Sequence, residues 1–256
     1  MINLGFKDRN ILIIGGTSGI GLAAAGLFAG EQACVGIVGR SADRLESALK
    51  KLRASHPEAK IVGCVGDVAD EDSMRNAINS IVSELCGIDH VVNSAGIAGS
   101  FGESVDQVRA EDFIEVQRVN VLGAFLAAKL TLPYLKEGVD PTYTLVGSDS
   151  GFVTAPGMLA YNASKGAVVQ LTRALSVELH KPHGIRVNSV CPSIVDTPMS
   201  RDGMGVDSFA EVDYPVSTPE QIAWLVLALA SPNSIAVNGA SLLADYGYHA
   251  RSSFPA

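Results

Sequence analysis

Near its N-terminus the chain reads Ile11-Leu12-Ile13-Ile14-Gly15-Gly16-Thr17-Ser18-Gly19-Ile20-Gly21, followed by an alanine-rich segment. The apolar run is typical of a buried strand, and the alanine-rich segment is typical of a helix. The glycines between them let the backbone turn sharply and approach a pyrophosphate, and the helix N-terminus supplies free N–H donors. This order predicts a nucleotide site. No Gly-Lys-Ser or Gly-Lys-Thr follows, which excludes a Walker-type loop.

Short β-branched runs alternate with alanine- and leucine-rich amphipathic segments along the whole chain, as in repeated βαβ units on a parallel sheet. We predict strands at Ile11–Ile14, Cys34–Val38, Lys60–Val65, Asp89–Asn93, Thr142–Gly147, Arg186–Val190 and Ser241–Ala244. We predict helices at Gly19–Ala29, Ala42–Ala54, Glu71–Leu85, Glu111–Leu135, Tyr161–His180 and Pro219–Ala230. This pattern favours one doubly wound α/β domain over residues 1–256, with ligands bound outside the carboxyl ends of the strands.

The segment Ser193–Thr218 has no clear periodicity and contains two prolines and two glycines. We predict that it forms a mobile substrate flap over the site. Methionines and a phenylalanine in or near it are expected to pack or to line an apolar pocket.

Composition excludes several classes of protein. The 256 residues include 19 Lys and Arg against 27 Asp and Glu, a net charge of −8, which is the wrong sign for nucleic-acid binding. Hydrophobic residues make up 47% and charged residues 18%, as expected for a compact fold rather than a disordered chain. The apolar runs are too short for a signal peptide or a membrane span, so neither export nor membrane insertion is expected.

Cysteine and histidine positions argue against a metal or redox centre. The four cysteines Cys34, Cys64, Cys86 and Cys191 lie far apart, without the paired spacing of zinc or redox motifs, and we expect them to be reduced in a cytoplasmic protein. His180 and His183 are close in sequence, but Pro182 should break the helix between them, and no third ligand is evident. We therefore predict no metal site.

Gly39-Arg40 at the end of the second predicted strand bears on the choice of dinucleotide. An acid is usual at this position, where it binds ribose hydroxyls and repels a 2′-phosphate. Without that carboxylate, and with a guanidinium next to it, a 2′-phosphate is tolerated. We therefore favour NADP and keep NAD as the alternative, in which Arg40 is simply a solvated residue. Ser18 means that no second basic residue lies in the glycine turn.

Tyr161 and Lys165 lie at positions i and i+4 of a predicted helix and therefore on the same face. A neighbouring ammonium favours the phenolate, so the phenol can act as a general acid or base closer to neutrality. Ser148, 13 residues before Tyr161, follows a predicted strand, and its hydroxyl is placed to face the same carbonyl oxygen. Ser150 lies close by, so the choice of Ser148 rests on this spacing.

From about Lys7 to His249 the chain resembles the short-chain dehydrogenase/reductase family, whose fold is a single-domain Rossmann fold. The resemblance rests on six motifs in order: Gly15–Gly21, Asp67-Val68, Asn93-Ser94-Ala95-Gly96, Asn120, the Ser148, Tyr161 and Lys165 set, and Pro192-Ser193-Ile194-Val195-Asp196-Thr197. The cofactor-binding residues expected from the resemblance and from Arg40 are Gly15, Thr17, Ser18, Gly19, Ile20, Gly21, Arg40, Asp67, Val68, Asn93, Ala95, Gly96, Tyr161, Lys165, Pro192, Val195 and Thr197.

The resemblance implies a hydride transfer between a nicotinamide and an alcohol/ketone pair, with catalytic residues Ser148, Tyr161, Lys165 and Asn120. Tyr161 would exchange the proton, and Ser148 would hold the substrate oxygen. Lys165 would bind the nicotinamide ribose and lower the pKa of Tyr161, and Asn120 would position a water that links Lys165 to solvent. The family also implies a homodimer or homotetramer built on the helices near Glu111–Leu135 and Tyr161–His180.

Four residues depart from the family pattern: Ile14, Ser94, Ser193 and Tyr246. None of them removes a catalytic group. Ile14 and Ser94 put local strand bonding in question. Ser193 and Tyr246 replace glycines and are expected to alter the floor of the substrate pocket.

Three other functions are weighed against this one. A 3-oxoacyl thioester reductase of the same fold is disfavoured by the acidic residues in Ser193–Thr218, which would repel an anionic acyl carrier. The segment Gly147–Gly151 resembles the nucleophile elbow of a hydrolase with Asp149 at its centre, but Pro156 and Gly157 follow instead of a helix. A catalytically silent nucleotide-sensing protein is disfavoured by the intact Ser148, Tyr161 and Lys165.

Overall fold

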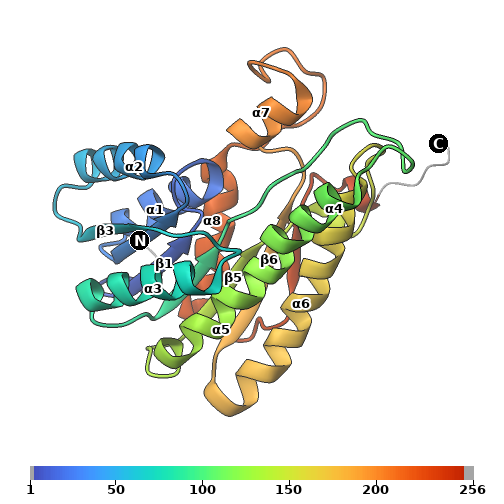
Figure 1. Ribbon diagram of the computed structural model, residues 1–256. Coiled ribbons are helices and arrows are strands. Elements are labelled where there is room, and N and C mark those ends of the chain that lie inside the picture. The colour runs from blue at the N-terminus through green and yellow to red at the C-terminus, as the bar shows by residue number, and fades with distance from the viewer. Residues whose placement is uncertain (1–2, 251–256) are drawn as a thin grey trace.

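The computed structural model describes residues 3–250 as a seven-stranded parallel sheet with helices on both faces (Figure 1). The strands lie in the order β3-β2-β1-β4-β5-β6-β7. Their bounds are β1 Asn10–Ile14, β2 Cys34–Gly39, β3 Ile61–Val65, β4 His90–Asn93, β5 Thr142–Val146, β6 Arg186–Pro192 and β7 Ser241–Ala244. All seven predicted strands are confirmed, and the sheet order reverses beside β1, which places a crevice between the carboxyl ends of β1 and β4.

Helices cover both faces of the sheet. Their bounds are α1 Gly19–Gly30, α2 Ala42–Ser55, α3 Glu71–Leu85, α4 Ala110–Gln117, α5 Gly123–Leu135, α6 Leu159–His183, α7 Pro198–Met204 and α8 Pro219–Ala230. One apolar cluster joins the sheet to α3, α5 and α6, and a second joins it to α1, α2 and α8. This three-layer arrangement buries nearly all of β1 and β4, and Ile11–Ile14 of β1 are accordingly a continuous apolar run.

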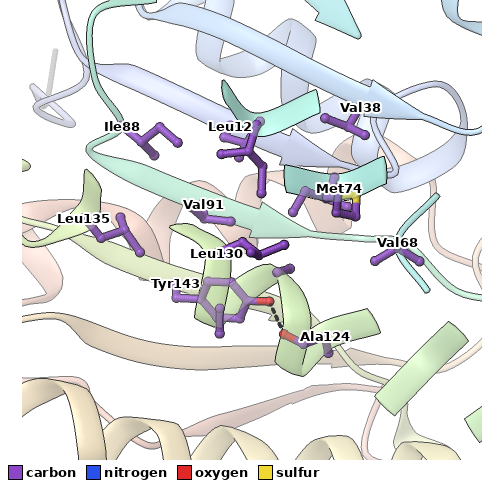
Figure 2. Close-up of a cluster of buried hydrophobic side chains, with 14 of the residues drawn as sticks. Leu12, Val38, Val68, Met74, Ile88, Val91, Ala124, Leu130, Leu135 and Tyr143 are labelled. Carbon is purple, nitrogen blue, oxygen red and sulfur yellow. Dashed lines mark hydrogen bonds between the residues drawn. The ribbon is translucent and has the colours of Figure 1, made fainter. Parts of the chain in front are cut away.

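Tyr143 on β5 fixes the layer that carries α5 (Figure 2). Its ring is fully buried, and its hydroxyl donates a hydrogen bond of 2.8 Å to the Ala124 carbonyl. The same hydroxyl accepts one of 3.2 Å from Nδ2 of Asn93 at the end of β4. Burial raises the pKa of this phenol, so it stays a neutral donor at every physiological pH. The end of β4 is thereby held against α5.

Arg186 at the start of β6 fastens the opposite layer. Its buried guanidinium donates hydrogen bonds to the carbonyls of Leu229, Ala230, Ser231 and Val237, at 2.8 to 3.2 Å. Three of these carbonyls end helix α8 and have no partner within the helix. A cation at a helix C-terminus also offsets the helix dipole. Arg186 therefore holds the end of α8 to the sheet.

Two helix predictions need correction. The helix predicted at Glu111–Leu135 is interrupted by a π-helical turn at Arg118–Leu122, which separates α4 from α5. Helix α6 does not end before Pro182 but continues to His183. The proline removes a single hydrogen bond in the last turn, and Gly184 in the left-handed region closes the helix by donating to the His180 carbonyl at 2.7 Å.

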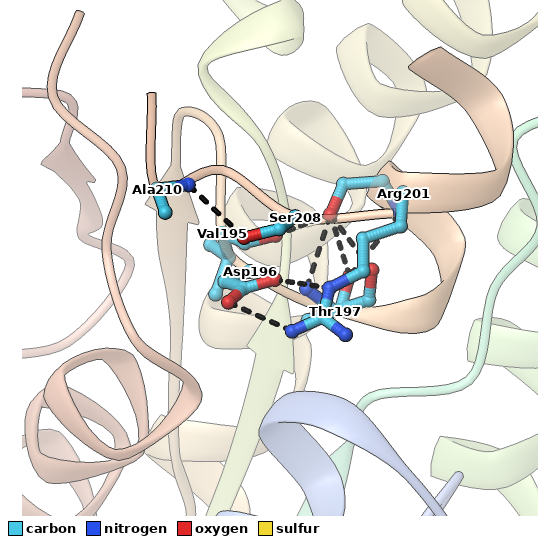
Figure 3. Close-up of polar contacts among 7 residues, drawn as sticks. Val195, Asp196, Thr197, Arg201, Ser208 and Ala210 are labelled. Carbon is cyan, nitrogen blue, oxygen red and sulfur yellow. Dashed lines mark hydrogen bonds and ion pairs between the residues drawn. The ribbon is translucent and has the colours of Figure 1, made fainter. Parts of the chain in front are cut away.

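The segment Ser193–Thr218 contains the short helix α7, which the absence of periodicity did not predict. Figure 3 shows its start: Arg201 forms a bidentate ion pair with Asp196, and Thr197 caps the helix through the Ser200 amide. The flap role of this segment stays a prediction. Figure 1 shows α7 standing above the sheet, apart from the other helices.

Within residues 3–250 none of the helices combines the length and the apolar composition that a membrane span requires. No group of three or more His, Cys, Asp and Glu side chains in that range is arranged to hold a metal ion.

Candidate active site

A cavity of about 720 Å³ opens at the carboxyl ends of the strands, where the doubly wound topology predicts a ligand. The predicted site residues that line it are Gly15, Thr17, Ser18, Gly19, Ile20, Arg40, Asp67, Val68, Ala95, Gly96, Ser148, Tyr161, Lys165, Pro192, Val195 and Thr197. Gly21, Asn93 and Asn120 do not line it and lie behind its wall. The fold therefore brings nearly all of the predicted residues to one place.

The glycine turn leaves room for a phosphate at the start of α1. Gly15 has φ +82°, and a Cβ on Gly21 would lie 2.3 Å from the Gly15 carbonyl oxygen, so neither position accepts a side chain. Ser18 at the N-cap makes no side-chain cap bond, and the first turn of α1 holds no acidic residue. The first N–H groups of the helix are thus available to an anion.

The end of the cavity beside β2 carries two basic side chains. A Cβ on Gly39 would lie 2.3 Å from Cγ2 of Thr17, so a carboxylate cannot take this position without displacing a stiff β-branched side chain. Arg40 lines the cavity as predicted, and Arg44 lines it as well. Sequence reasoning missed Arg44. Its position one helical turn after Arg40, in the first turn of α2, was the signal that could have found it.

Asn93 and Asp67 shape the floor through backbone hydrogen bonds. Oδ1 of Asn93 accepts from the Ala95 amide at 3.2 Å, and Oδ1 of Asp67 accepts from the Ala69 amide at 3.0 Å. These bonds turn the chain sharply after β4 and after β3. They account for the polar residues at these positions without requiring a contact with a ligand.

Asn120 lies inside the π-helical turn and is 3% exposed. Its side chain accepts from the Ile97 amide at 2.8 Å and donates to the Ile97 carbonyl and to Oγ of Ser164, both at 2.9 Å. It therefore ties the loop after β4 to helix α6. A Cβ on Gly96 would lie 3.2 Å from Asn120 Oδ1 and 4.0 Å from Lys165 Nζ, so the amide and the ammonium flank the same glycine.

Tyr161, Lys165 and Ser148 meet in the cavity. Lys165 is 5% exposed, its Nζ lies 5.5 Å from the centre of the Tyr161 ring, and it donates to the Val146 carbonyl at 3.0 Å. Burial lowers the pKa of Lys165 to about 8. Burial also raises the pKa of Tyr161 to about 12, although a hydrogen bond with Ser148 acts in the opposite direction. The expectation of a lowered tyrosine pKa is therefore wrong, because the effect of burial outweighs that of the hydrogen bond.

The structure also distinguishes the two serines and the hydrolase alternative. Ser148 is the serine that contacts Tyr161, and its Oγ accepts from the Ser150 amide at 3.1 Å. The segment Asp149–Gly151 forms a single 3-10 turn, and the next α-helix starts only at Leu159. A nucleophile elbow needs a helix directly after the nucleophile, so the hydrolase geometry is absent from this loop.

The two glycine replacements expected at the pocket floor behave differently. Ser193 lines the cavity. Tyr246 is not among the lining residues; it is 56% exposed and its hydroxyl accepts from Ser217 Oγ at 3.2 Å. Of the two replacements, whose effect on the pocket the sequence leaves open, only Ser193 is therefore part of the cavity wall.

Comparisons with known proteins agree with this geometry. A family model described as enoyl-(acyl carrier protein) reductase matches residues 15–249. The chain is 36% identical to 2-(S)-hydroxypropyl-CoM dehydrogenase 3 of Xanthobacter autotrophicus, over 94% of this chain and 96% of the relative. It is 33% identical to the NADP-dependent (R)-specific alcohol dehydrogenase of Lentilactobacillus kefiri, over 96% and 98%. The crystal structure of levodione reductase superposes with a TM-score of 0.90, at 29% identity over 96% and 100%.

A doubly wound sheet with a glycine turn, a cavity at its carboxyl edge and a buried lysine beside a half-buried tyrosine defines a nicotinamide-dependent oxidoreductase of alcohols and ketones. The chain belongs to the short-chain dehydrogenase/reductase family, as its sequence motifs predict.

Proposed function

We propose that this enzyme transfers a hydride between NADP(H) and an alcohol/ketone pair, with Tyr161 as the general acid or base. One observation carries the proposal: Ser148, Tyr161 and Lys165 converge in a cavity whose far end presents Arg40 and Arg44. Serine, tyrosine and lysine supply a donor to the substrate oxygen, a titratable proton and a supporting charge.

The residues that line the cavity support a dinucleotide that carries a 2′-phosphate. The glycine turn and the uncapped start of α1 would hold the pyrophosphate. Arg40 and Arg44 would hold the 2′-phosphate, and no carboxylate at position 39 repels it. Pro192, Val195 and Thr197 line the end where a nicotinamide carboxamide would bind. When bound, the nicotinamide supplies or accepts the hydride.

The chain's own residues hold the substrate oxygen and move the proton. Ser148 and Tyr161, which share a hydrogen bond, would both contact the carbonyl oxygen. With its pKa near 12, the Tyr161 hydroxyl is protonated at neutral pH and is ready to donate to that oxygen during reduction. After the proton has left Tyr161, the Lys165 ammonium stabilises the phenolate. Lys165 carries this charge below about pH 8. Asn120 would keep the loop after β4 close to Lys165. The protonated Tyr161 hydroxyl and the charged Lys165 ammonium favour ketone reduction at neutral pH.

The cofactor preference is tested by titrating the purified protein with NADPH and NADH while nicotinamide fluorescence is followed. Loss of one charge-assisted contact costs about 1.5–3 kcal/mol, so we expect Arg40→Ala and Arg44→Ala each to weaken NADPH about 10- to 100-fold. NADH binding should change by less than about threefold, because NADH has no 2′-phosphate. Arg75→Ala, which removes an exposed partner of Glu71 outside the cavity, is the control. Equal losses for both cofactors would refute the 2′-phosphate assignment.

The two remaining alternatives are separated by substrate tests. A nucleotide-sensing protein would bind NADPH and reduce no ketone, so any stereospecific ketone reduction excludes it. A 3-oxoacyl thioester reductase would prefer a carrier-bound acyl thioester. Asp202, Asp207 and Glu211 in the segment Ser193–Thr218 disfavour that anionic partner.

We also infer a homodimer or homotetramer built on the face of α4, α5 and α6. The exposed side chains of Ile114, Leu122 and Phe125 line a shallow groove there, together with the partly buried Leu171. An apolar patch of this kind marks an association surface.

All four cysteines are free, which supports a reducing compartment such as the cytoplasm.

The assembly is tested by Phe125→Asp, because Phe125 is 45% exposed in that groove. A buried charge without a partner should dissociate the oligomer, and sedimentation velocity should show the mass of one chain. Val139→Asp changes an equally exposed valine outside the groove and should leave the sedimentation coefficient unchanged. A wild-type chain that sediments as a monomer would rule out the assembly.

A further inference from the structure

Asp149 brings a negative charge to the substrate half of the cavity. The charged side chains that line the cavity within residues 3–250 are Arg40, Arg44, Asp67, Asp149 and Lys165. The first three lie at the adenine end, and Lys165 belongs to the catalytic set. The wall between Tyr161 and α7 is otherwise apolar or carries hydroxyl groups, and its large apolar side chains are Phe101, Val153, Met158, Ile194, Met199 and Met204.

The carboxylate of Asp149 is only half satisfied. Its Oδ1 accepts a hydrogen bond of 3.0 Å from Oγ of Ser148, the serine that contacts Tyr161. No group in the described part of the chain donates to its Oδ2. Asp149 is half-buried in the cavity wall, so this oxygen must find its partner in water or in a ligand.

The charge lies close to the reacting groups. The Asp149 carboxylate raises the pKa of the Tyr161 phenol and of the Cys191 thiol. The 3.0 Å hydrogen bond from Ser148, the serine that contacts Tyr161, shows directly that the carboxylate lies beside the reacting groups. A substrate whose oxygen binds Ser148 and Tyr161 is therefore bound next to this carboxylate.

We propose that Asp149 selects substrates that carry a hydrogen-bond donor on the carbon next to the reacting one, as in a vicinal diol and its hydroxyketone. A hydroxyl group there would donate to Oδ2 and displace water from an apolar wall. An alkyl group in the same place would bury the carboxylate oxygen without a partner, which is costly. A carboxylate there would be repelled, and an ammonium would be attracted more strongly than a hydroxyl. This inference rests on the proposed alcohol/ketone activity.

Matched ketones test the inference. In the first series the methyl ketone carries CH2OH, ethyl or carboxylate: 1-hydroxypropan-2-one, butan-2-one and 2-oxopropanoate. In the second, larger pair, 2-hydroxy-1-phenylethanone is compared with 1-phenylpropan-1-one. Within each pair a hydroxyl replaces a methyl group of nearly the same size. Because hydroxyketones are intrinsically more reactive toward hydride, the quantity compared is the change in the kcat/KM ratio between wild type and variant.

We expect Asp149→Leu to lower the hydroxyl-to-methyl ratio about 10- to 100-fold, since one hydrogen bond to a charged group is lost. Asp149→Asn keeps the size of the side chain and one acceptor oxygen, so it should lower the hydroxyl-to-methyl ratio of kcat/KM less than Asp149→Leu does. Asp149→Asn should also raise kcat/KM for 2-oxopropanoate relative to butan-2-one by about tenfold, because repulsion is removed. Unchanged NADPH affinity and thermal midpoint show that the variants fold. If Asp149→Leu does not fold, the 2-oxopropanoate measurement with Asp149→Asn decides.

Two results overturn the inference, and they differ. Ketone reduction with the same ratio in wild type, Asp149→Asn and Asp149→Leu overturns the role of Asp149 alone. If wild type binds NADPH but reduces none of these ketones and oxidises none of the matching alcohols, the proposed function fails and the inference fails with it.

Discussion

Tyr161→Phe is expected to lower kcat for ketone reduction by about 10²- to 10⁴-fold, the usual contribution of a positioned general acid. The substitution removes one hydroxyl and keeps the ring, so the cavity wall retains its shape. The pKa of Tyr161 near 12 keeps this hydroxyl protonated at neutral pH, so the lost group is the proton donor itself. NADPH affinity should stay within about twofold of wild type, because the nucleotide end of the cavity is untouched.

The measurement is single-turnover reduction of a ketone by bound NADPH, followed at the nicotinamide absorbance. Tyr134→Phe is the matched control. It removes a hydroxyl that donates to Asn79 Oδ1 at 2.8 Å on the surface, and kcat should not change. Activity retained in Tyr161→Phe would assign the proton to another group and would refute the proposed mechanism.

Lys165→Met is expected to lower kcat/KM for reduction at least about 100-fold. It should also abolish the decline of kcat/KM above about pH 8. Burial lowers the pKa of Lys165 to about 8, so the ammonium is present below this pH and is lost as pH rises through it. The wild-type kcat/KM for reduction should therefore fall above about pH 8. The methionine variant has no such group, and its profile should be flat there.

Profiles between pH 6 and 10 provide the check, with thermal unfolding as the test of folding. Lys165→Arg keeps a charge at every pH of this range and should show weak activity without the decline near pH 8. A wild-type profile that is flat through pH 8, or a methionine variant that keeps the decline, would show that Lys165 does not control the reaction.

The sequence predicted the sheet well because short β-branched runs, such as Ile11–Ile14, alternate with helical segments along the chain. Continuous helices were less predictable. Pro182 was expected to end α6, but a proline near a helix C-terminus costs one hydrogen bond, which the Gly184 cap compensates. Helix α7 was missed because its stability comes from Thr197, Ser200 and the Asp196–Arg201 ion pair rather than from an apolar stripe.

The site was predictable as a set of motifs but less so as an electrostatic environment. Spacing placed Ser148, Tyr161 and Lys165 together, and the structure confirms that they meet. The sign of the Tyr161 pKa shift depends on burial, which only the three-dimensional packing reveals. The same holds for Arg44 and Asp149, which become wall residues only because α2 and the loop after β5 turn toward the cavity.

The π-helical turn at Arg118–Leu122 sets the rotational phase of two helices. The Gly123 amide bonds to the Arg118 carbonyl five residues earlier, so the turn holds one residue more than an α-helix. Each residue advances an α-helix by about 100°, and one residue of offset therefore rotates α4 by that angle relative to α5. A regular helix through this segment could not direct both Asn120 toward Ile97 and the apolar stripe of α5 toward the sheet. One inserted residue reconciles the two orientations.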